Sequence, residues 1–201
     1  MSITNYSELQ TSVANWLNRG DLSANVPDFI ALAECQLSTD LKTRAMEAKV
    51  TLATVAGTNT VALPTDMLEM RRVQVVGTYN QPLSYRSPDE ISIDFAANGV
   101  GQPTVFTVIG GNLELAPIPD AVYSLELTYQ QRIPALSGTN TTNWLLTSWP
   151  NAYLYASLLA ATPFIMNDAR IATWANLYSE AIDSINSVDW YSGSTMKVRA
   201  R

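Results

Sequence analysis

The fold of this chain is decided by Asn143-Trp144-Leu145-Leu146-Thr147-Ser148-Trp149-Pro150-Asn151-Ala152-Tyr153-Leu154-Tyr155, where a helical pattern takes over from a run of strands. A helix is predicted over residues 149–164, because proline is tolerated in a first helical turn. It must break or kink at Pro163, which offers no backbone N–H. Asn167-Asp168 then reads as the cap of a further helix over residues 168–190, whose apolar side chains recur every three or four residues. They are Ile171, Trp174, Tyr178, Ile182 and Ile185.

Two more helices are predicted near the start of the chain, over residues 5–19 and 25–42. Asn5 followed three residues later by Glu8 is a capping-box pattern, in which side chains satisfy orphan backbone N–H groups. Asn25 repeats the cap signal, with a proline and an aspartate in the next turn. The two helices should form an antiparallel pair. The expected apolar stripes are Tyr6, Leu9, Val13, Trp16 and Leu17 on the first helix, and Val26, Ile30, Ala33, Leu37 and Leu41 on the second.

Between the two helix pairs the spacing of apolar residues changes to strict alternation, which indicates strands. A hairpin is expected over residues 50–63, with its turn at Ala56-Gly57-Thr58-Asn59. Ser87-Pro88-Asp89-Glu90 reads as the start of a short helix, and Gly110-Gly111 reads as a tight turn. Further strands are expected over residues 69–76, 82–86, 105–109, 113–115 and 123–129.

The predicted fold class is α+β, with a four-helix bundle formed by the N- and C-terminal helix pairs and an inserted β-rich subdomain. A chain of 201 residues, 47% of them hydrophobic, is long enough to bury a substantial core. The expected parts are residues 1–48, an N-terminal helix pair; 49–133, the inserted β-rich subdomain; 134–191, the C-terminal helix pair that completes the bundle; and 192–201, a flexible C-terminal arm.

Composition argues against several classes of function. The chain has no histidine, the side chain used most for acid–base chemistry near neutral pH and the commonest metal ligand. No metal and no cofactor are therefore expected. The single cysteine, Cys35, cannot form an intrachain disulfide and is predicted to be a small core residue. No secretory signal or apolar run of the roughly 18 residues needed for a membrane span is present, so the protein is expected to fold in the cytoplasm of the cell that makes it, without membrane contact.

Carboxylate pairs are the only catalytic material in the sequence. Asp89-Glu90, and Glu180 with Asp183, lack a partner acid or base at a motif spacing, so they are predicted to serve helix starts or solvated faces. Asp66 and Glu69 bracket a turn into a strand. The glycine pairs lack the strand, helix and following Lys-Ser or Lys-Thr of a phosphate loop. Neither catalysis nor nucleotide binding is expected.

The order and spacing of these segments resemble those of the head-to-tail adaptor (connector) proteins of tailed phages. Residues 143–155 and Asn167-Asp168-Ala169-Arg170-Ile171-Ala172-Thr173-Trp174 resemble the C-terminal helical region of that family. Ahead of them, Leu113 to Asp120, Leu125 to Tyr129 and Ile133 to Leu136 look like the family's strand pair and its run into the helices. The resemblance covers Met67 to Tyr191.

This resemblance implies a structural protein of the virion neck and not an enzyme. Such adaptors assemble as a dodecameric ring beneath the portal protein, lengthen the DNA channel and present a lower face to the next tail or nozzle protein. DNA would pass through the channel without sequence-specific binding. Two alternatives stay open on the sequence alone, a tail-associated peptidoglycan-degrading enzyme and a glycan-binding module.

The charges describe an acidic body with a basic tail. The formal net charge is -6, and Lys197, Arg199 and Arg201 supply +3 with no acid after Asp189, so residues 1–196 carry -9. Arg71-Arg72 lies in an expected strand, so its side chains should point to opposite faces. An acidic body argues against a nucleic-acid clamp, whereas carboxylates lining a channel would repel DNA phosphates and let the duplex slide.

The end of the chain is the candidate portal-binding arm. Trp190-Tyr191 stands where the last helix loses its pattern, and exposed aromatic residues at such a place are typical interface anchors. After the small residues 192–195, apolar and basic residues alternate, which in an extended strand puts apolar groups on one side and cations on the other. The predicted arm residues are Trp190, Tyr191, Met196, Lys197, Val198, Arg199 and Arg201.

Overall fold

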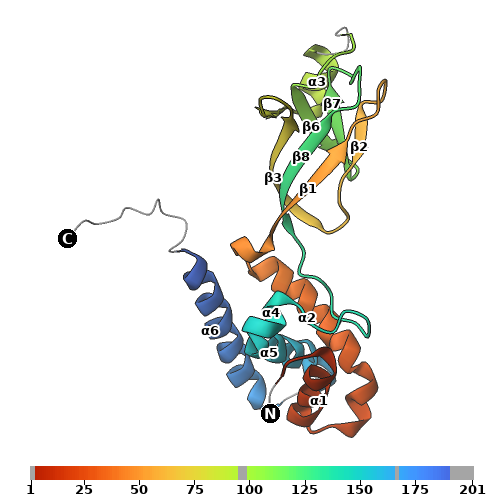
Figure 1. The fold of residues 1–201 in the computed structure, drawn as a ribbon. Coiled ribbons are helices and arrows are strands. Elements are labelled where there is room, and N and C mark those ends of the chain that lie inside the picture. Colours follow the sequence, from red (N-terminus) through yellow and green to blue (C-terminus); the bar gives the residue numbers. More distant parts are fainter. Residues whose placement is uncertain (1–2, 95–98, 166–167, 191–201) are drawn as a thin grey trace, which may run out of the picture. The chain divides into compact units, whose positions relative to one another are not determined.

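The structure of the protein is a computed structural model that describes residues 3–94, 99–165 and 168–190. The chain is α+β, as predicted, with six α-helices and two sheets among the described residues. It divides into two compact units, a helical unit made of Met1–Met46 and Ile133–Arg201, and a β unit made of Glu47–Arg132 (Figure 1).

The helical unit is organised around α5, which packs against α1, α2, α4 and α6. The sequence of α5 contains no charged residue, and Ala152, Tyr153 and Leu158 are completely buried. A helix that is apolar on all sides belongs in the middle of a core. The elements of this unit are α1 (Tyr6–Leu17), η1 (Gly20–Asn25), α2 (Val26–Asp40), η2 (Arg44–Met46), α4 (Trp144–Ser148), α5 (Pro150–Ala160), η3 (Thr162–Phe164) and α6 (Arg170–Trp190).

The predicted helix spans are confirmed apart from their exact ends, and so is the cap at Asn5. Asn5 accepts a hydrogen bond from the backbone N–H of Glu8 at 2.9 Å, and α5 stops before Pro163 as expected. The cap predicted at Asn25 is wrong. The short helix η1 runs directly into α2, so the backbone of Asn25 is already helical, with φ -92° and ψ -10°, and its side chain makes no cap hydrogen bond. The separate helix α4 was not predicted.

Cys35 is exposed, so its prediction as a core residue is wrong. The residues that α2 buries include Ile30, Ala33 and Leu37, as the predicted stripe requires, and Cys35 falls on the opposite side of the helix. Trp16 on α1 is also 44% exposed, although its neighbour Leu17 is buried. An apolar residue type on a helix was therefore not enough to predict that its side chain is buried.

The β unit contains two four-stranded sheets, in the orders β1-β8-β3-β4 and β2-β7-β6-β5. Their shared core includes Val73, Val75, Leu113, Leu125 and Leu127, each no more than 3% exposed. The elements are β1 (Glu47–Ala53), β2 (Thr60–Ala62), β3 (Met67–Val76), β4 (Gln81–Pro82), β5 (Ser84–Tyr85), α3 (Pro88–Asp94), β6 (Val105–Ile109), β7 (Asn112–Ala116) and β8 (Ser124–Gln131).

The hairpin predicted over residues 50–63 is wrong, because β1 and β2 belong to different sheets. β1 pairs with β8, and β2 pairs with β7. Thr54, buried to 1% exposure, donates its hydroxyl to the carbonyl of Ala121 and accepts the backbone N–H of Tyr123, which ties the end of β1 to the start of β8. The turn residues that follow carry the chain across to the second sheet.

Two other local predictions of the β unit are confirmed and one is corrected. Gly110 and Gly111, with φ 57° and 80°, form the two-residue turn between β6 and β7, a conformation that favours glycine. Helix α3 begins at Pro88 as expected. The single strand predicted over 82–86 is in fact split at Leu83, because β4 pairs with β3 in one sheet and β5 pairs with β6 in the other.

Candidate functional site

The predicted portal-binding arm lies outside the described residues. This holds for Tyr191, Met196, Lys197, Val198, Arg199 and Arg201, and for the side chain of Trp190, whose backbone ends α6. The structure therefore leaves these residues as a prediction.

The acid pairs weighed as catalytic candidates have ordinary structural partners. Glu90 and Ser87 cap α3 reciprocally: the backbone N–H of Ser87 donates to the Glu90 carboxylate at 2.9 Å, and that of Glu90 donates to the Ser87 hydroxyl at 3.3 Å. These bonds lower the pKa of Glu90. Asp66 accepts hydrogen bonds from Gln131 and Tyr129, and Glu69 pairs with Arg71 at 3.9 Å.

Glu180 and Asp183 are exposed on α6. In residues 3–94, 99–165 and 168–190, no three His, Cys, Asp or Glu side chains lie close enough to hold a metal ion. The same residues contain no helix whose length and apolar character would let it cross a bilayer.

Arg71 and Arg72 are both exposed and lie near different carboxylates. The pairing of β3 with β8 shifts register between Met70 and Arg72, so a bulge occurs at this dipeptide. Arg72 lies 3.6 Å from Glu126, which also sits 3.5 Å from Lys49 and accepts a hydrogen bond from Gln74 at 2.8 Å. Basic side chains on this sheet are thus matched by a carboxylate.

A buried carboxylate holds the helical unit together at the point where the chain returns from the β unit. Glu34 of α2 is 7% exposed. One of its oxygens accepts the backbone N–H of Leu136 at 2.7 Å and the hydroxyl of Tyr153 at 3.2 Å. The Asn143 amide donates to that hydroxyl at 2.6 Å and to the carbonyl of Pro134 at 2.8 Å. Residues 134–143 and α5 therefore meet α2, from which the whole β unit separates them in the sequence.

Burial dominates the electrostatics of this network. Removal from water raises the pKa of Glu34, and the two hydrogen bonds that it accepts only partly oppose this effect. Burial likewise raises the pKa of Tyr153, helped by the neighbouring carboxylate, so the phenol stays protonated and can donate. The network was not predicted from the sequence, because a glutamate in the middle of an amphipathic helix gives no local sign that it faces inward.

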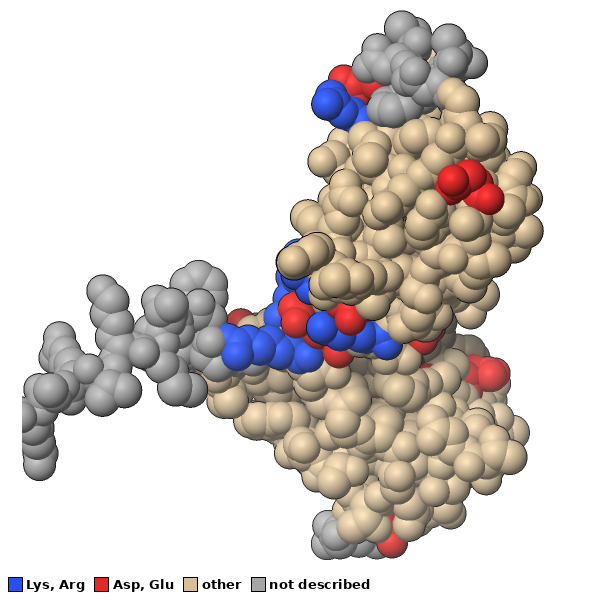
Figure 2. All heavy atoms as spheres, turned by 45° about the horizontal axis from the view of Figure 1, so that its top comes forward, with Lys and Arg blue, Asp and Glu red and all other residues tan. Residues whose placement is uncertain are grey.

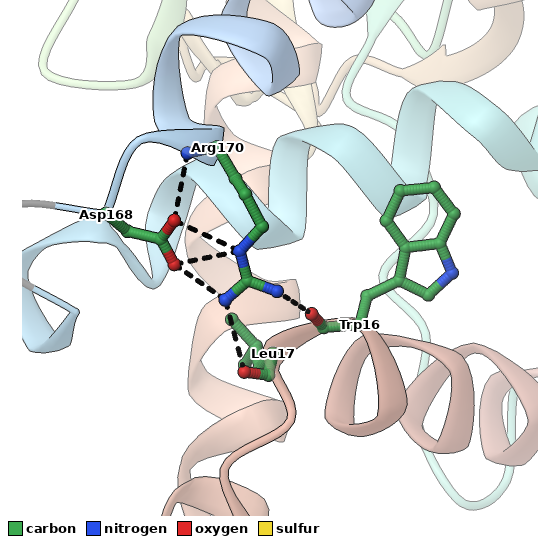
Figure 3. Close-up of polar contacts among 4 residues, drawn as sticks. All are labelled: Trp16, Leu17, Asp168 and Arg170. Atoms are coloured by element: carbon green, nitrogen blue, oxygen red, sulfur yellow. Dashed lines mark hydrogen bonds and ion pairs between the residues drawn. The ribbon is translucent and has the colours of Figure 1, made fainter.

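A second set of polar contacts, the Arg170 clamp, joins the start of α6 to the end of α1 (Figure 3). Arg170 donates to the carbonyl of Trp16 at 2.9 Å and to that of Leu17 at 3.5 Å. Its guanidinium also binds the Asp168 carboxylate, at distances down to 2.6 Å, and lies 5.0 Å from the centre of the Trp174 ring. The last carbonyls of a helix lack partners and carry partial negative charge, so a cation placed there is favourable.

Uncharged surface dominates the face of the molecule shown in Figure 2. Exposed large apolar side chains are concentrated in the β unit, which carries ten of the fourteen found among the described residues. They are Val55, Leu68, Val76, Tyr79, Tyr85, Val100, Val108, Ile109, Ile118 and Val122. Apolar side chains of this kind mark a binding surface where they lie together in one patch.

Comparison with known families identifies the chain. The sequence profile of the family described as "SU10 adaptor protein" matches residues 4–199. The chain belongs to the SU10 adaptor protein family. This confirms the predicted adaptor family and makes the protein a phage structural component. A search of curated proteins found no match.

The family match spans both units of this adaptor. It includes every residue of the Glu34 network and of the Arg170 clamp. The Glu34 network joins α2 to α5, and the Arg170 clamp joins α1 to α6, through these hydrogen bonds.

The substitution Glu34→Gln should remove a pH dependence from the stability of the adaptor. The raised pKa means that Glu34 favours folding most below its unfolded pKa, and that this contribution is lost as pH rises through the folded pKa. Each tenfold difference in proton affinity between the folded and unfolded states corresponds to about 1.4 kcal/mol. Above the folded pKa, the glutamine variant should therefore be the more stable protein, and its advantage should shrink as pH falls.

The measurement is urea unfolding followed by tryptophan fluorescence across a pH series. All five tryptophans belong to the helical unit, so the signal reports that unit alone. Glu180→Gln, on an exposed part of α6, is the matched control and should track the wild type. Parallel stability curves for Glu34→Gln and the wild type would show that Glu34 is not destabilised by burial.

Replacing Arg170 should loosen the junction between α1 and α6. Arg170→Ala should lower the urea midpoint of the tryptophan transition. Arg170→Lys should recover only part of the loss, because a lysine ammonium cannot make the several fixed hydrogen bonds of a planar guanidinium. Arg19→Ala removes a cation of similar exposure that binds only Asp21, two residues away, and should have a smaller effect. Equal midpoints for the Arg170→Ala and Arg19→Ala variants would contradict a clamping role.

Proposed function

We propose that the protein is a head-to-tail adaptor that forms a dodecameric ring below the portal of a tailed phage. The ring extends the DNA channel and attaches the next tail or nozzle protein. The observation that carries this proposal is the family match over residues 4–199. The protein is made in the host cytoplasm and ends in the neck of the virion, between capsid and tail.

The two units have different tasks in this proposal. Helices α1, α2, α5 and α6 act as a four-helix bundle that contacts neighbouring subunits and the portal. The β unit faces the tail. Its ten exposed large apolar side chains support that assignment, since a surface of this kind is suited to burial against the protein that follows in the tail.

Acidity has a physical role in the channel. Residues 1–196 carry a formal charge of -9, obtained from -6 for the whole chain and +3 for the last three cations. A ring repeats that charge in every subunit, and carboxylates facing DNA repel its phosphates. DNA therefore passes without sequence-specific binding.

The C-terminal arm, residues 192–201, docks the ring onto the portal. Met196 and Val198 provide apolar anchors, while Lys197, Arg199 and Arg201 bind an acidic portal surface. Because association must first offset several kcal/mol of lost rotational and translational freedom, a portal that orders the subunits promotes ring formation more than concentration alone does.

Deleting residues 193–201 tests this function. The truncated protein should melt at nearly the wild-type temperature, because it retains both units, but should fail to assemble with portal particles in co-sedimentation and electron microscopy. Replacing the three cations by alanine should cause a salt-sensitive partial loss, which separates charge from apolar anchoring. If the truncated protein still occupied portal particles as fully as the wild type does, docking through the arm would be contradicted.

A further inference from the structure

The helical unit has an apolar groove that its own described elements leave open. It has a volume of about 400 Å³ and lies between α2, α5 and α6. Leu32, on the α2 side, is 58% exposed although it belongs to the groove wall. The lining residues are Leu32, Ala33, Gln36, Ala156, Leu159, Ala160 and Tyr178.

A carboxylate stands beside this groove. Asp40, at the end of α2, accepts hydrogen bonds from the Gln36 amide at 2.8 Å and from the Tyr178 hydroxyl at 2.7 Å, and both donors line the groove. The two bonds fix the position of the carboxylate relative to the apolar lining. A ligand with an apolar side chain followed by a cation could therefore use the groove and Asp40 together.

The helices around the groove are otherwise free of basic residues. Neither α2 nor α5 contains lysine or arginine, and the sole basic residue of α6 is Arg170, which is bound to Asp168 at its far end. Glu180 and Asp183 add exposed carboxylates on α6. Lys42, two residues beyond Asp40, is an exposed cation close to this end of α2. The groove is thus an apolar surface with a fixed carboxylate beside it, which suits a basic and apolar peptide.

We propose that this groove binds the chain's own last six residues, Met196–Arg201, in the free subunit. The segment alternates apolar and basic residues in the sequence Met-Lys-Val-Arg-Ala-Arg, with no acid. Met196 and Val198 enter the groove, and the intervening cations pair with Asp40 and the carboxylates beyond it. The chemistry of the segment matches that of the groove on both counts, apolar and electrostatic.

Chain length selects this part of the tail. Tyr178 lies twelve residues before the end of α6 at Trp190, which is about 18 Å at the rise of an α-helix. A fully extended chain covers about 3.3 Å per residue, so no residue nearer than about the sixth after Trp190 can return to the level of Tyr178. Met196 is the sixth residue after Trp190, and the alternating segment starts there.

This contact goes beyond the proposed function and does not depend on it. It concerns the single subunit in solution, and it holds whether or not the arm later binds a portal. If both proposals are right, the portal must draw the arm out of the groove, so the groove restrains the arm until the portal is present.

Cys35 gives a direct test, because it is the only cysteine, is exposed, and lies on α2 next to Gln36. Leu32, Cys35 and Gln36 occupy neighbouring positions on one side of the helix. A disulfide requires Cα atoms within about 7 Å. In a Val198→Cys variant of the full chain, equilibrated in a glutathione redox buffer, we expect an intrachain disulfide to Cys35, seen as a monomer on a non-reducing gel and by mass spectrometry.

Three further variants make the test specific. Ala200→Cys, which keeps Met196 and Val198 intact, should also form the intrachain disulfide. Asp40→Asn, combined with Val198→Cys, should lower the effective concentration of the two thiols several-fold, as should added salt. Asp28→Asn is the matched control on the same helix. It should leave the effective concentration of the two thiols nearly unchanged, because Asp28 does not line the groove.

Each outcome decides the proposal. An intrachain disulfide that weakens with Asp40→Asn supports it. Disulfide-linked dimers as the main product would mean that the groove takes the tail of another copy, and would overturn it. The absence of any disulfide to Cys35 in both cysteine variants would overturn it as well, and so would an intrachain disulfide indifferent to Asp40 and to salt. None of these results depends on portal occupancy, so failure here leaves the test of the adaptor function intact.

Discussion

One buried hydrogen-bond network, centred on Glu34, positions the two parts of the helical unit. These parts are separated in sequence by the whole β unit, and Glu34 is where the second part is tied to the first. The backbone of Leu136 and the hydroxyl of Tyr153 both reach this one side chain, and Asn143 links them to the start of α4. A buried polar network of this kind specifies one arrangement, because a helix packed in another register would leave a charge and several donors without partners.

The β unit can be inserted into the helical unit because its first and last strands are neighbours. β1 and β8 pair in an antiparallel ladder, with Glu47 opposite Gln130. The chain therefore leaves and rejoins the helical unit through strands whose Cα atoms are roughly 5 Å apart. Each unit keeps its own core, with Leu125 and Leu127 in one and Tyr153 in the other. An adaptor needs such an arrangement if its two units are to present separate surfaces to separate partners.

Features that depend on neighbouring residues could be predicted from the sequence, whereas features that depend on contacts between distant residues could not. Helix spans, the stop before Pro163 and the Gly110-Gly111 turn follow from periodicity, proline chemistry and left-handed backbone conformation. The strand partners of β1 and β2 could not be read locally, since alternation marks a strand but not its neighbour. The same limit applies to the site: Glu34 and Arg170 look like ordinary helix residues until the fold brings Leu136 and the end of α1 to them.

We propose that this fold serves as a structural ring component between capsid and tail. The family match establishes an adaptor, and the exposed apolar side chains of the β unit and the net negative charge support the proposed ring. The most direct measurement is cryo-electron microscopy of the full-length protein mixed with portal particles of its own phage. The account predicts a symmetric ring of this chain on the tail side of the portal, with the helical unit against the portal and the channel continuous through both. Portals without added density, or with the chain bound anywhere other than around the channel exit, would contradict it.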